Sequence, residues 1–397
     1  MKKYASYRER VEAPGPKRML SLDGGGIRGL ISIEILARIE HELREAYGDP
    51  HLVLADYFDY IAGTSTGAII ASGISLGMTM LEIREFYLRG ARHMLKPAPF
   101  FRKLWYSLRV TGLTDELQRR LGDTRLGDPG LTDPSFSEAR KAYPIRTLLL
   151  LVMYRCDTDS PWPLSNNPKA KYNVGTLKDG NNAYLPLWQL VRASTAAPTY
   201  FPPQEIVIGD QTCIFVDGAV TAYNNPAYAL YMMATLEPYR LCWERGEKEM
   251  LLVSVGTGSI PNSDKRLKPR QMTLLYNARR VPSAVIYAST VEADKMCRVT
   301  GRCTFGGKID SEIGDLVEPL PAPSVRPKEF TYVRYDPDLS EKGLTDLGVF
   351  PRITSEQVLP LISGEHVQEL TEVGGEFARK SVNLAHFGSH APAPVVS

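Results

Sequence analysis

The sequence lacks any apolar run that could cross a membrane. Its longest one, Leu148 to Tyr154, is far below the roughly 18 to 20 residues that a spanning helix needs. The first ten residues carry charges but no apolar core of the kind found in a secretory signal peptide. We therefore predict a soluble, cytoplasmic protein whose contact with a membrane would be peripheral.

Metal-binding patterns are also missing. The five cysteines are scattered, odd in number and without the close Cys or His partners of a zinc site, so reduced thiols and no metal or cofactor are predicted. Charge of one sign is not in excess either, because 47 basic and 45 acidic residues leave a formal net charge of +2. Nucleic acid is therefore not expected as a partner, and any attraction to anionic lipid must come from a local patch.

What the chain does have is the composition of a globular protein. The content of 43% hydrophobic and 23% charged residues excludes a disordered chain, a collagen-like fibre and a long coiled coil. The length of 397 residues exceeds the roughly 150 residues of an average domain, and no internal repeat is visible. One large core with an annex is the expected organisation.

Two consecutive strand-helix units open the chain. Residues 19–22 are apolar enough for a strand, and the helix after them is expected to end at Gly48, which can adopt a left-handed cap conformation. The second unit has a strand at 57–62, a turn at 63–67 and a helix at 68–76. Two such units in succession favour a parallel sheet.

Further strands and helices follow up to residue 258, after which the pattern weakens. Strands are predicted at 148–154, 213–216 and 251–255, helices at 187–194 and 227–236, and a long surface loop at 157–182. The fold class is therefore α/β, with a parallel-rich central sheet flanked by helices and a C-terminal annex. The predicted divisions are an N-terminal extension (1–17), a catalytic domain (18–258) and an annex packed on it (259–397).

A G-x-S-x-G pattern lies between a predicted strand and a predicted helix, at Gly63, Ser65 and Gly67. A serine on such a sharp turn needs glycine two positions to either side to avoid Cβ clashes, and it then points out at the carboxyl edge of the sheet. The helix that follows supplies backbone N–H groups that favour a developing oxyanion. An ordinary Gly/Ser/Thr turn remains the alternative.

A glycine loop follows the first strand, from Asp23 to Gly29. It contains G-x-G-x-x-G at Gly24, Gly26 and Gly29, which alone would indicate a dinucleotide site. Such a site requires an acidic residue at the end of the second strand, where this sequence has the serine turn instead. A second use of this geometry is an oxyanion hole built from Gly25 and Gly26, with Arg28 steadying the loop or meeting a phosphate. A purely structural glycine turn is the remaining alternative.

A hydroxyl nucleophile needs a base. The six histidines are His41, His51, His93, His366, His386 and His390, and none of them closes a strand beside a turn. Asp217 follows the apolar residues 214–216, so a strand end delivers it to the same edge as Ser65. A partly dry pocket would raise the pKa of this carboxyl from its ordinary value near 3.9 and make it a workable base. A plain strand-end turn residue is the alternative.

These segments, in this order, resemble the patatin-like phospholipases. The motifs that carry the resemblance are DGGGIRG (23–29), GTSTG (63–67), ASTAAPTYFPP (193–203), DGA (217–219) and NNP (224–226). The resemblance implies a three-layer α/β/α hydrolase with a Ser65–Asp217 dyad, an oxyanion hole at Gly24, Gly25 and Gly26 with Arg28 nearby, and no metal. It also marks Gly29, Gly63, Gly67, Gly218 and Ala219 as motif residues, although many members have glycine where Ala219 stands, and Ala68 is a second mild departure.

Two basic stretches are candidates for contact with lipid or a regulator. Residues 92–110 hold five basic and four aromatic residues and no acid, a composition typical of a lipid interface or of a segment with aromatics in the core. Residues 265–280 hold six basic residues, read as a solvated face or as the site of a phosphorylated regulator. A small-molecule nucleotide activator is a further candidate partner, because some bacterial patatin-like proteins are effectors switched on by cyclic nucleotides.

The predicted function is that of a lipid acyl hydrolase of the phospholipase A or lysophospholipase type, working through an acyl-Ser65 intermediate. Alternatives with the same chemistry are a carboxylesterase for neutral lipid or small esters and a nucleotide-activated, membrane-degrading effector. A dinucleotide-dependent enzyme and a binding protein with an idle site stay open as other classes.

Overall fold

The computed structural model describes residues 4, 6–94, 111–128, 143–260, 268–319, 327–361 and 365–392. Its centre is a nine-stranded sheet in the order β5-β6-β3-β2-β1-β7-β9-β8, with β4 paired to β3. The strands are β1 (Lys17–Leu22), β2 (Tyr60–Thr64), β3 (Leu148–Arg155), β4 (Ser160–Ser165), β5 (Gln204–Ile208), β6 (Gln211–Asp217), β7 (Met250–Val255), β8 (Arg302–Phe305) and β9 (Thr331–Tyr335).

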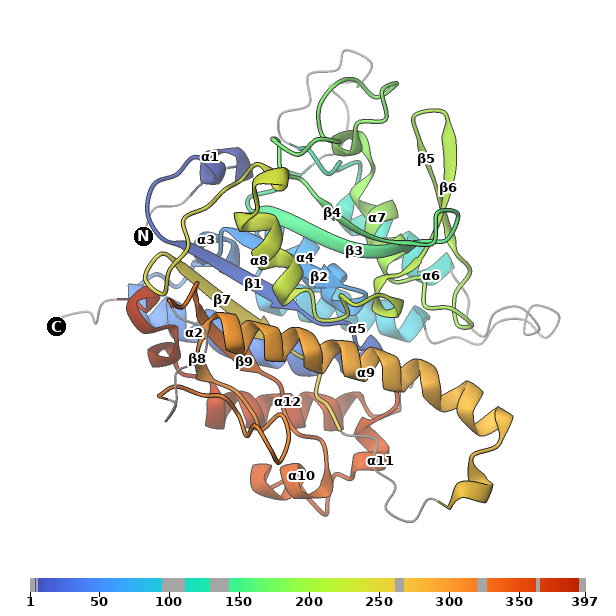
Figure 1. The fold of residues 1–397 in the computed structure, drawn as a ribbon, viewed down its shortest axis with the longest axis vertical. Coiled ribbons are helices and arrows are strands. Elements are labelled where there is room, and N and C mark those ends of the chain that lie inside the picture. Colours follow the sequence, from blue (N-terminus) through green and yellow to red (C-terminus); the bar gives the residue numbers. More distant parts are fainter. Residues whose placement is uncertain are drawn as a thin grey trace.

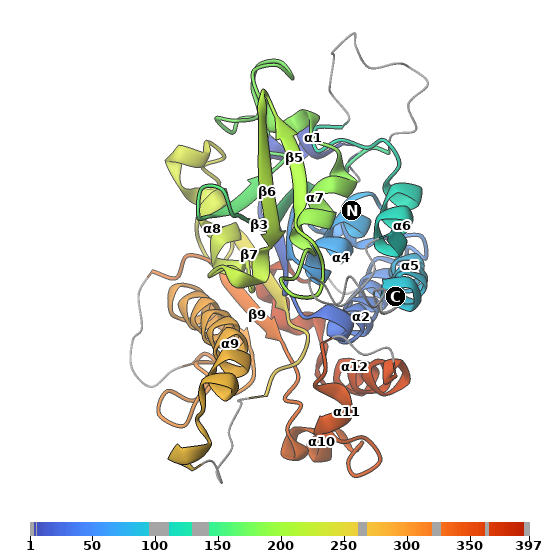
Figure 2. The same ribbon diagram turned by 90° about the vertical axis from the view of Figure 1, so that its right-hand side faces the viewer.

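Helices cover both faces of the sheet. They are α1 (Tyr7–Val11), α2 (Gly29–Tyr47), α3 (Leu54–Tyr57), α4 (Thr66–Ser75), α5 (Met80–Met94), α6 (Thr111–Leu121), α7 (Leu187–Ser194), α8 (Ala227–Thr235), α9 (Leu274–Thr300), α10 (Glu341–Leu347), α11 (Ser355–Val358) and α12 (Val367–Ser381). Figure 2 shows α8 and α9 on one side of the sheet and α2, α4, α5 and α12 on the other. This arrangement confirms the predicted α/β class with three layers.

The two strand-helix units form as the sequence predicts, with small shifts in their bounds. Helix α2 ends at Tyr47, and Gly48 adopts the left-handed conformation at φ 60°. Strand β2 pairs in parallel with β1 and β3, and β1 pairs in parallel with β7. The strand predicted at 57–62 begins later, because residues 54–57 form the short helix α3.

Strand β3 is the template on which the site is assembled. Strand β2 pairs with it in parallel up to the pair Thr64 and Val152, and β6 pairs with it in antiparallel fashion from Met153, opposite Asp217. Since β4 occupies the other edge of β3, β2 and β6 lie on the same edge and meet head-on. The last residues of both strands, Thr64 and Asp217, are therefore neighbours.

The prediction of a surface loop over 157–182 is wrong for its first part, where β4 pairs with β3. Beyond residue 258 the chain adds two parallel strands to the central sheet: β9 pairs with β7, and β8 pairs with β9. All five residues of β9 are buried. The 259–397 region thus continues the sheet as well as packing on it, whereas the division at 258 stays a prediction. Among the residues described, no helix is long and apolar enough to span a bilayer.

Because β9 covers the edge of β7, a chain cut after Gly258 should not fold stably. The cut would leave the buried, apolar strand β7 as an unpaired edge, which promotes aggregation. We expect the 1–258 fragment to lose the cooperative thermal unfolding transition of the full chain, measured by circular dichroism. A fragment that melts cooperatively and stays monodisperse would contradict this role of β9.

Candidate active site

Ser65 lies on a sharp turn between β2 and α4. Its backbone has φ 55° and ψ −121°, a conformation that a non-glycine residue rarely adopts. A Cβ at Gly63 would lie 2.2 Å from the carbonyl oxygen of Gly67, and a Cβ at Gly67 would lie 2.3 Å from the carbonyl oxygen of Leu22. Glycine is therefore required at both positions for the turn to close against the end of β1, as the pattern predicts.

The hydroxyl of Ser65 meets the carboxylate of Asp217. Ser65 Oγ donates a hydrogen bond of 2.6 Å to Asp217 Oδ2, although the two residues are 152 positions apart. The other carboxylate oxygen, Oδ1, accepts the backbone N–H of Ala219 at 2.8 Å. Gly218 begins the short 3₁₀ turn η4 (Gly218–Val220). Ala219 contributes only its backbone N–H to Asp217, so alanine serves there as well as glycine.

Burial raises the pKa of Asp217 to about 6, and three nearer influences oppose the shift. These are the hydrogen bond from Ser65, the backbone N–H of Ala219 and the positive charge of Arg192. A carboxylate with this pKa is mostly ionised at pH 7 yet is more basic than an exposed aspartate. Such a carboxylate, in hydrogen-bond contact with a hydroxyl, can act as a proton acceptor.

Arg192 is a functional candidate that the sequence analysis does not name, and Ser194 lies in the 193–203 motif, for which the sequence predicts no role. Arg192, on α7, is 1% exposed, and burial lowers its pKa to about 10 while the charge of Asp217 acts in the opposite direction. The sequence does carry a signal for Arg192, because it is the only charged residue of α7. Ser194 accepts the backbone N–H of Ser65 at 2.9 Å and donates to the carbonyl of Val152 at 2.6 Å, which fixes the turn to β3.

The glycine loop lies directly beside the serine. A Cβ at Gly24 would be 3.3 Å from Cβ of Ser65. The N–H of Gly24 is already used, because it donates to the carbonyl of Asn224 at 3.1 Å. Within the described residues, no backbone partner is found for the N–H groups of Gly25 and Gly26. These two groups are the ones left to stabilise an oxyanion.

The C-terminal region holds this loop in place. Gly26 has φ +58°, and a Cβ there would lie 2.2 Å from the carbonyl oxygen of Leu361. That same carbonyl accepts the N–H of Ile27 at 2.9 Å. The backbone at Leu361, more than 300 residues further along the chain, therefore packs directly against the glycine loop.

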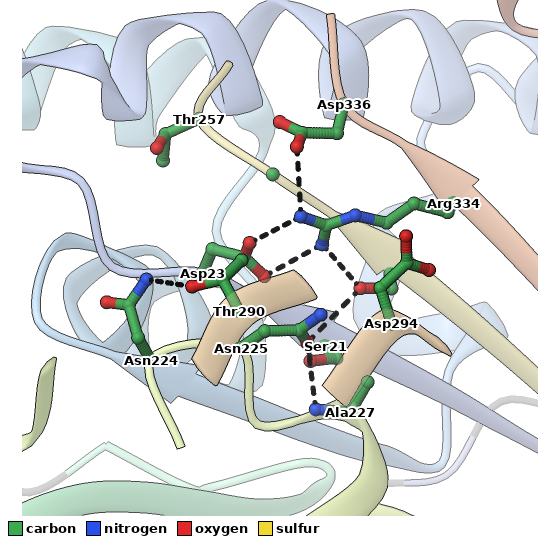
Figure 3. A network of polar contacts seen from close by, with 12 residues as sticks. Ser21, Asp23, Asn224, Asn225, Ala227, Thr257, Thr290, Asp294, Arg334 and Asp336 are labelled. Atoms are coloured by element: carbon green, nitrogen blue, oxygen red, sulfur yellow. Dashed lines mark hydrogen bonds and ion pairs between the residues drawn. The ribbon is translucent and has the colours of Figure 1, made fainter. Parts of the chain in front are cut away.

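A buried charge network continues from the start of the loop (Figure 3). Arg334, on β9, makes a two-pronged contact with Asp23, at 2.9 Å to Oδ1 and 2.6 Å to Oδ2, and donates to Asp336 at 3.1 Å and to Ser254 at 2.8 Å. Burial raises the pKa of Asp23 to about 6, against the lowering influence of Arg334. Asp336 in turn accepts the N–H of Gly258 at 2.8 Å.

Arg28 and Gly29 lie at the end of the loop. Burial lowers the pKa of Arg28 to about 10, and the charge of Asp336 opposes the shift. The carboxylate of Asp336 thus acts on both Arg28 and Arg334, and the role of Arg28 in steadying the loop stays a prediction. Gly29 is the first residue of α2 and packs against Thr66.

Histidine does not enter the site as the structure describes it. None of the five histidines with described side chains has a hydrogen bond or ion pair with Ser65 or Asp217. Over the described ranges, no group of three or more His, Cys, Asp or Glu side chains is arranged to hold a metal ion. The basic stretch predicted at 92–110 cannot be assessed, because residues 95–110 and the side chains of 92–94 lie outside what the structure describes.

Comparison with known proteins agrees with this geometry. The family model described as "Patatin-like phospholipase" matches residues 20–231. Patatin-17 of Solanum cardiophyllum is 31% identical over 264 residues, covering 62% of this chain and 62% of that protein. Patatin-16 of Solanum tuberosum is 30% identical over 281 residues, covering 66% and 64%. A Vibrio cholerae protein named "cGAMP-activated phospholipase" is 31% identical over 217 residues, covering 53% and 56%. The chain thus spans less than two thirds of the length of each of these relatives.

Proposed function

Because the chain belongs to the patatin-like phospholipase family, we propose that it is a lipid acyl hydrolase that cleaves fatty acyl esters of phospholipids or lysophospholipids. The observation that carries the proposal is the hydrogen bond of 2.6 Å from Ser65 Oγ, on the sharp turn after β2, to Asp217 Oδ2, at the end of β6. A serine in this backbone conformation has no evident structural need for a buried carboxylate. A dyad for acyl transfer accounts for both features.

In the proposed reaction Asp217 takes the hydroxyl proton while Ser65 Oγ attacks the ester carbonyl. The negative charge that develops on the carbonyl oxygen is stabilised by the N–H groups of Gly25 and Gly26 and by the N-terminal end of α4. Collapse of this intermediate breaks the ester bond, and Asp217 returns the proton to the leaving alcohol. A water molecule then attacks the acyl-Ser65 ester and gives a proton to Asp217. As the bond between the acyl carbon and Ser65 Oγ breaks, Asp217 returns this proton to Oγ, which releases the fatty acid and restores the free serine.

The substrate and the regulation are the finer parts of the proposal. The family name favours a phospholipid as the substrate. The protein would reach it by peripheral association with a membrane surface. A carboxylesterase for neutral lipid or small esters would use the same dyad. The Vibrio cholerae relative supports a second version, in which a small nucleotide switches on hydrolysis of membrane lipid.

If Ser65 and Asp217 act as one unit, each substitution alone should abolish the reaction. We expect Ser65→Ala and Asp217→Asn each to lower kcat for a short soluble ester by at least about 10³-fold, and the double variant to be little worse. Activity should survive excess chelator. Losses that multiply in the double variant, or a His→Ala variant as inactive as Ser65→Ala, would contradict the dyad.

The pKa of Asp217 predicts the acid limb of the pH profile. Since the base must be deprotonated, kcat/KM should rise with pH through about 6, rather than near the ordinary aspartate value. The positive charge of Arg192 lowers this pKa, so Arg192→Met should move the limb to higher pH while Arg192→Lys leaves it nearly unchanged. A limb at the same pH in both variants would show that Arg192 does not act on Asp217. Melting temperatures of both variants control for misfolding.

A further inference from the structure

The N-terminal half of α9 exposes an unusual amount of apolar surface. We define the α9 arm as residues 268–285, which comprise the 3₁₀ turn η6 (Pro269–Gln271) and the first half of α9. Leu274 is 88% exposed, Val281 53% and Val285 57%, and Met272 just before the helix is 52% exposed. Figure 1 shows this end of α9 and the turn before it standing clear of the sheet.

These apolar residues share one face of the helix. Leu274, Ala278, Val281 and Val285 follow one another at spacings of four, three and four residues, which place them in a single stripe, and all four are exposed. An apolar stripe left in water is costly, so a stripe of this kind marks a surface that another body covers.

The charges of the same segment are all of one sign. Between Lys268 and Val291 the chain has four basic residues and no acidic one. Lys268 and Arg270 are exposed in the turn before the helix. A basic segment with an apolar stripe matches an anionic lipid surface in both properties, since the stripe enters the acyl boundary and the cations meet the headgroups.

Other occupants fit less well. A second copy of the chain docked symmetrically would face the basic segment with itself, because a two-fold interface uses the same patch on both subunits. Nucleic acid would complement the charge but leave the apolar stripe in water.

The arm is joined directly to the candidate active site. On the same helix, Thr290 accepts a hydrogen bond of 2.9 Å from the side chain of Asn224, whose carbonyl oxygen holds the N–H of Gly24. Val285 is five residues from Thr290, or about 7.5 Å along the helix axis. Helix α9 also contacts η4, the turn directly after Asp217, where Val220 is 42% exposed. The helix that carries the exposed stripe thus also contacts the rim of the site, through Thr290 on its opposite face.

We propose that the α9 arm is the membrane-docking element of this protein: its apolar stripe enters an anionic lipid surface, and its basic residues bind the headgroups. The proposal rests on the proposed lipid hydrolase function and adds to it the surface that brings the site to the bilayer. Because the same helix contacts Asn224 and the turn after Asp217, docking here brings the rim of the site near the bilayer surface.

Vesicle sedimentation of the Ser65→Ala protein tests the docking without hydrolysis of the lipid. We expect binding to vesicles of phosphatidylcholine with phosphatidylserine, and weaker binding to phosphatidylcholine alone. Leu274→Glu combined with Val281→Glu should weaken binding to both kinds of vesicle by about tenfold or more. Lys268→Glu combined with Arg270→Glu should weaken binding to the anionic vesicles by about tenfold or more and leave binding to phosphatidylcholine nearly unchanged.

A matched control is Val207→Glu. Val207 lies on the β5–β6 hairpin, and its side chain is 63% exposed. Vesicle binding by this variant should stay within about twofold of the parent, because isolated surface substitutions away from an interface have small effects. Absence of binding to anionic vesicles, or equal binding by both arm variants and the parent, would overturn the proposal. So would sedimentation velocity showing that the arm variants only break up an oligomer, which would assign the stripe to a second copy.

The same variants with Ser65 intact separate this proposal from the proposed function. They should hydrolyse a short soluble ester at the parent rate and vesicle lipid about tenfold more slowly. A parent protein that binds vesicles through the arm but cleaves no ester would refute the hydrolase function and leave the docking surface standing.

Discussion

The site exists because two strands end against consecutive residues of a third. Strand β2 runs parallel to β3 and stops at Val152, and β6 runs antiparallel to β3 and stops at Met153. The head-on approach brings Ser65 and Asp217 together with no loop movement required. The carbonyl oxygen of Val152 also accepts the hydroxyl of Ser194, so the same point on β3 fixes the serine turn. Any change in the register of β6 by one residue would turn Asp217 to the other face of the sheet.

A second constraint links the two halves of the chain. Asp23 and Arg334 are both 3% exposed at their side chains, and Asp23 would be a buried, uncompensated charge without Arg334. Removal of one partner from such a pair costs about 3 to 5 kcal/mol of stability. Since Asp23 starts the glycine loop and Arg334 lies on β9, the position of the loop depends on the C-terminal strands. The site is thus completed by residues far outside the matched family segment.

The sequence predicted the parts of the site that depend on local backbone geometry. The turn is predicted by the pattern of Gly63, Ser65 and Gly67, and a strand end is predicted by the apolar residues before Asp217. The sequence did not predict β4, because Pro161 and Pro163 argue against a strand. These prolines are tolerated because β4 is an edge strand that pairs only with β3. Strand β9 was missed because Arg334 interrupts its apolar pattern, and the partner that makes this burial possible, Asp23, is 311 positions away.

The central claim is that Ser65 is the nucleophile activated by Asp217. The most direct measurement is mass spectrometry of the protein after reaction with a fluorophosphonate, with peptide mapping of the adduct. The account predicts one adduct per chain, located on Ser65, formed far more slowly in the Asp217→Asn protein. An adduct on another residue, or no adduct on a folded protein, would contradict it.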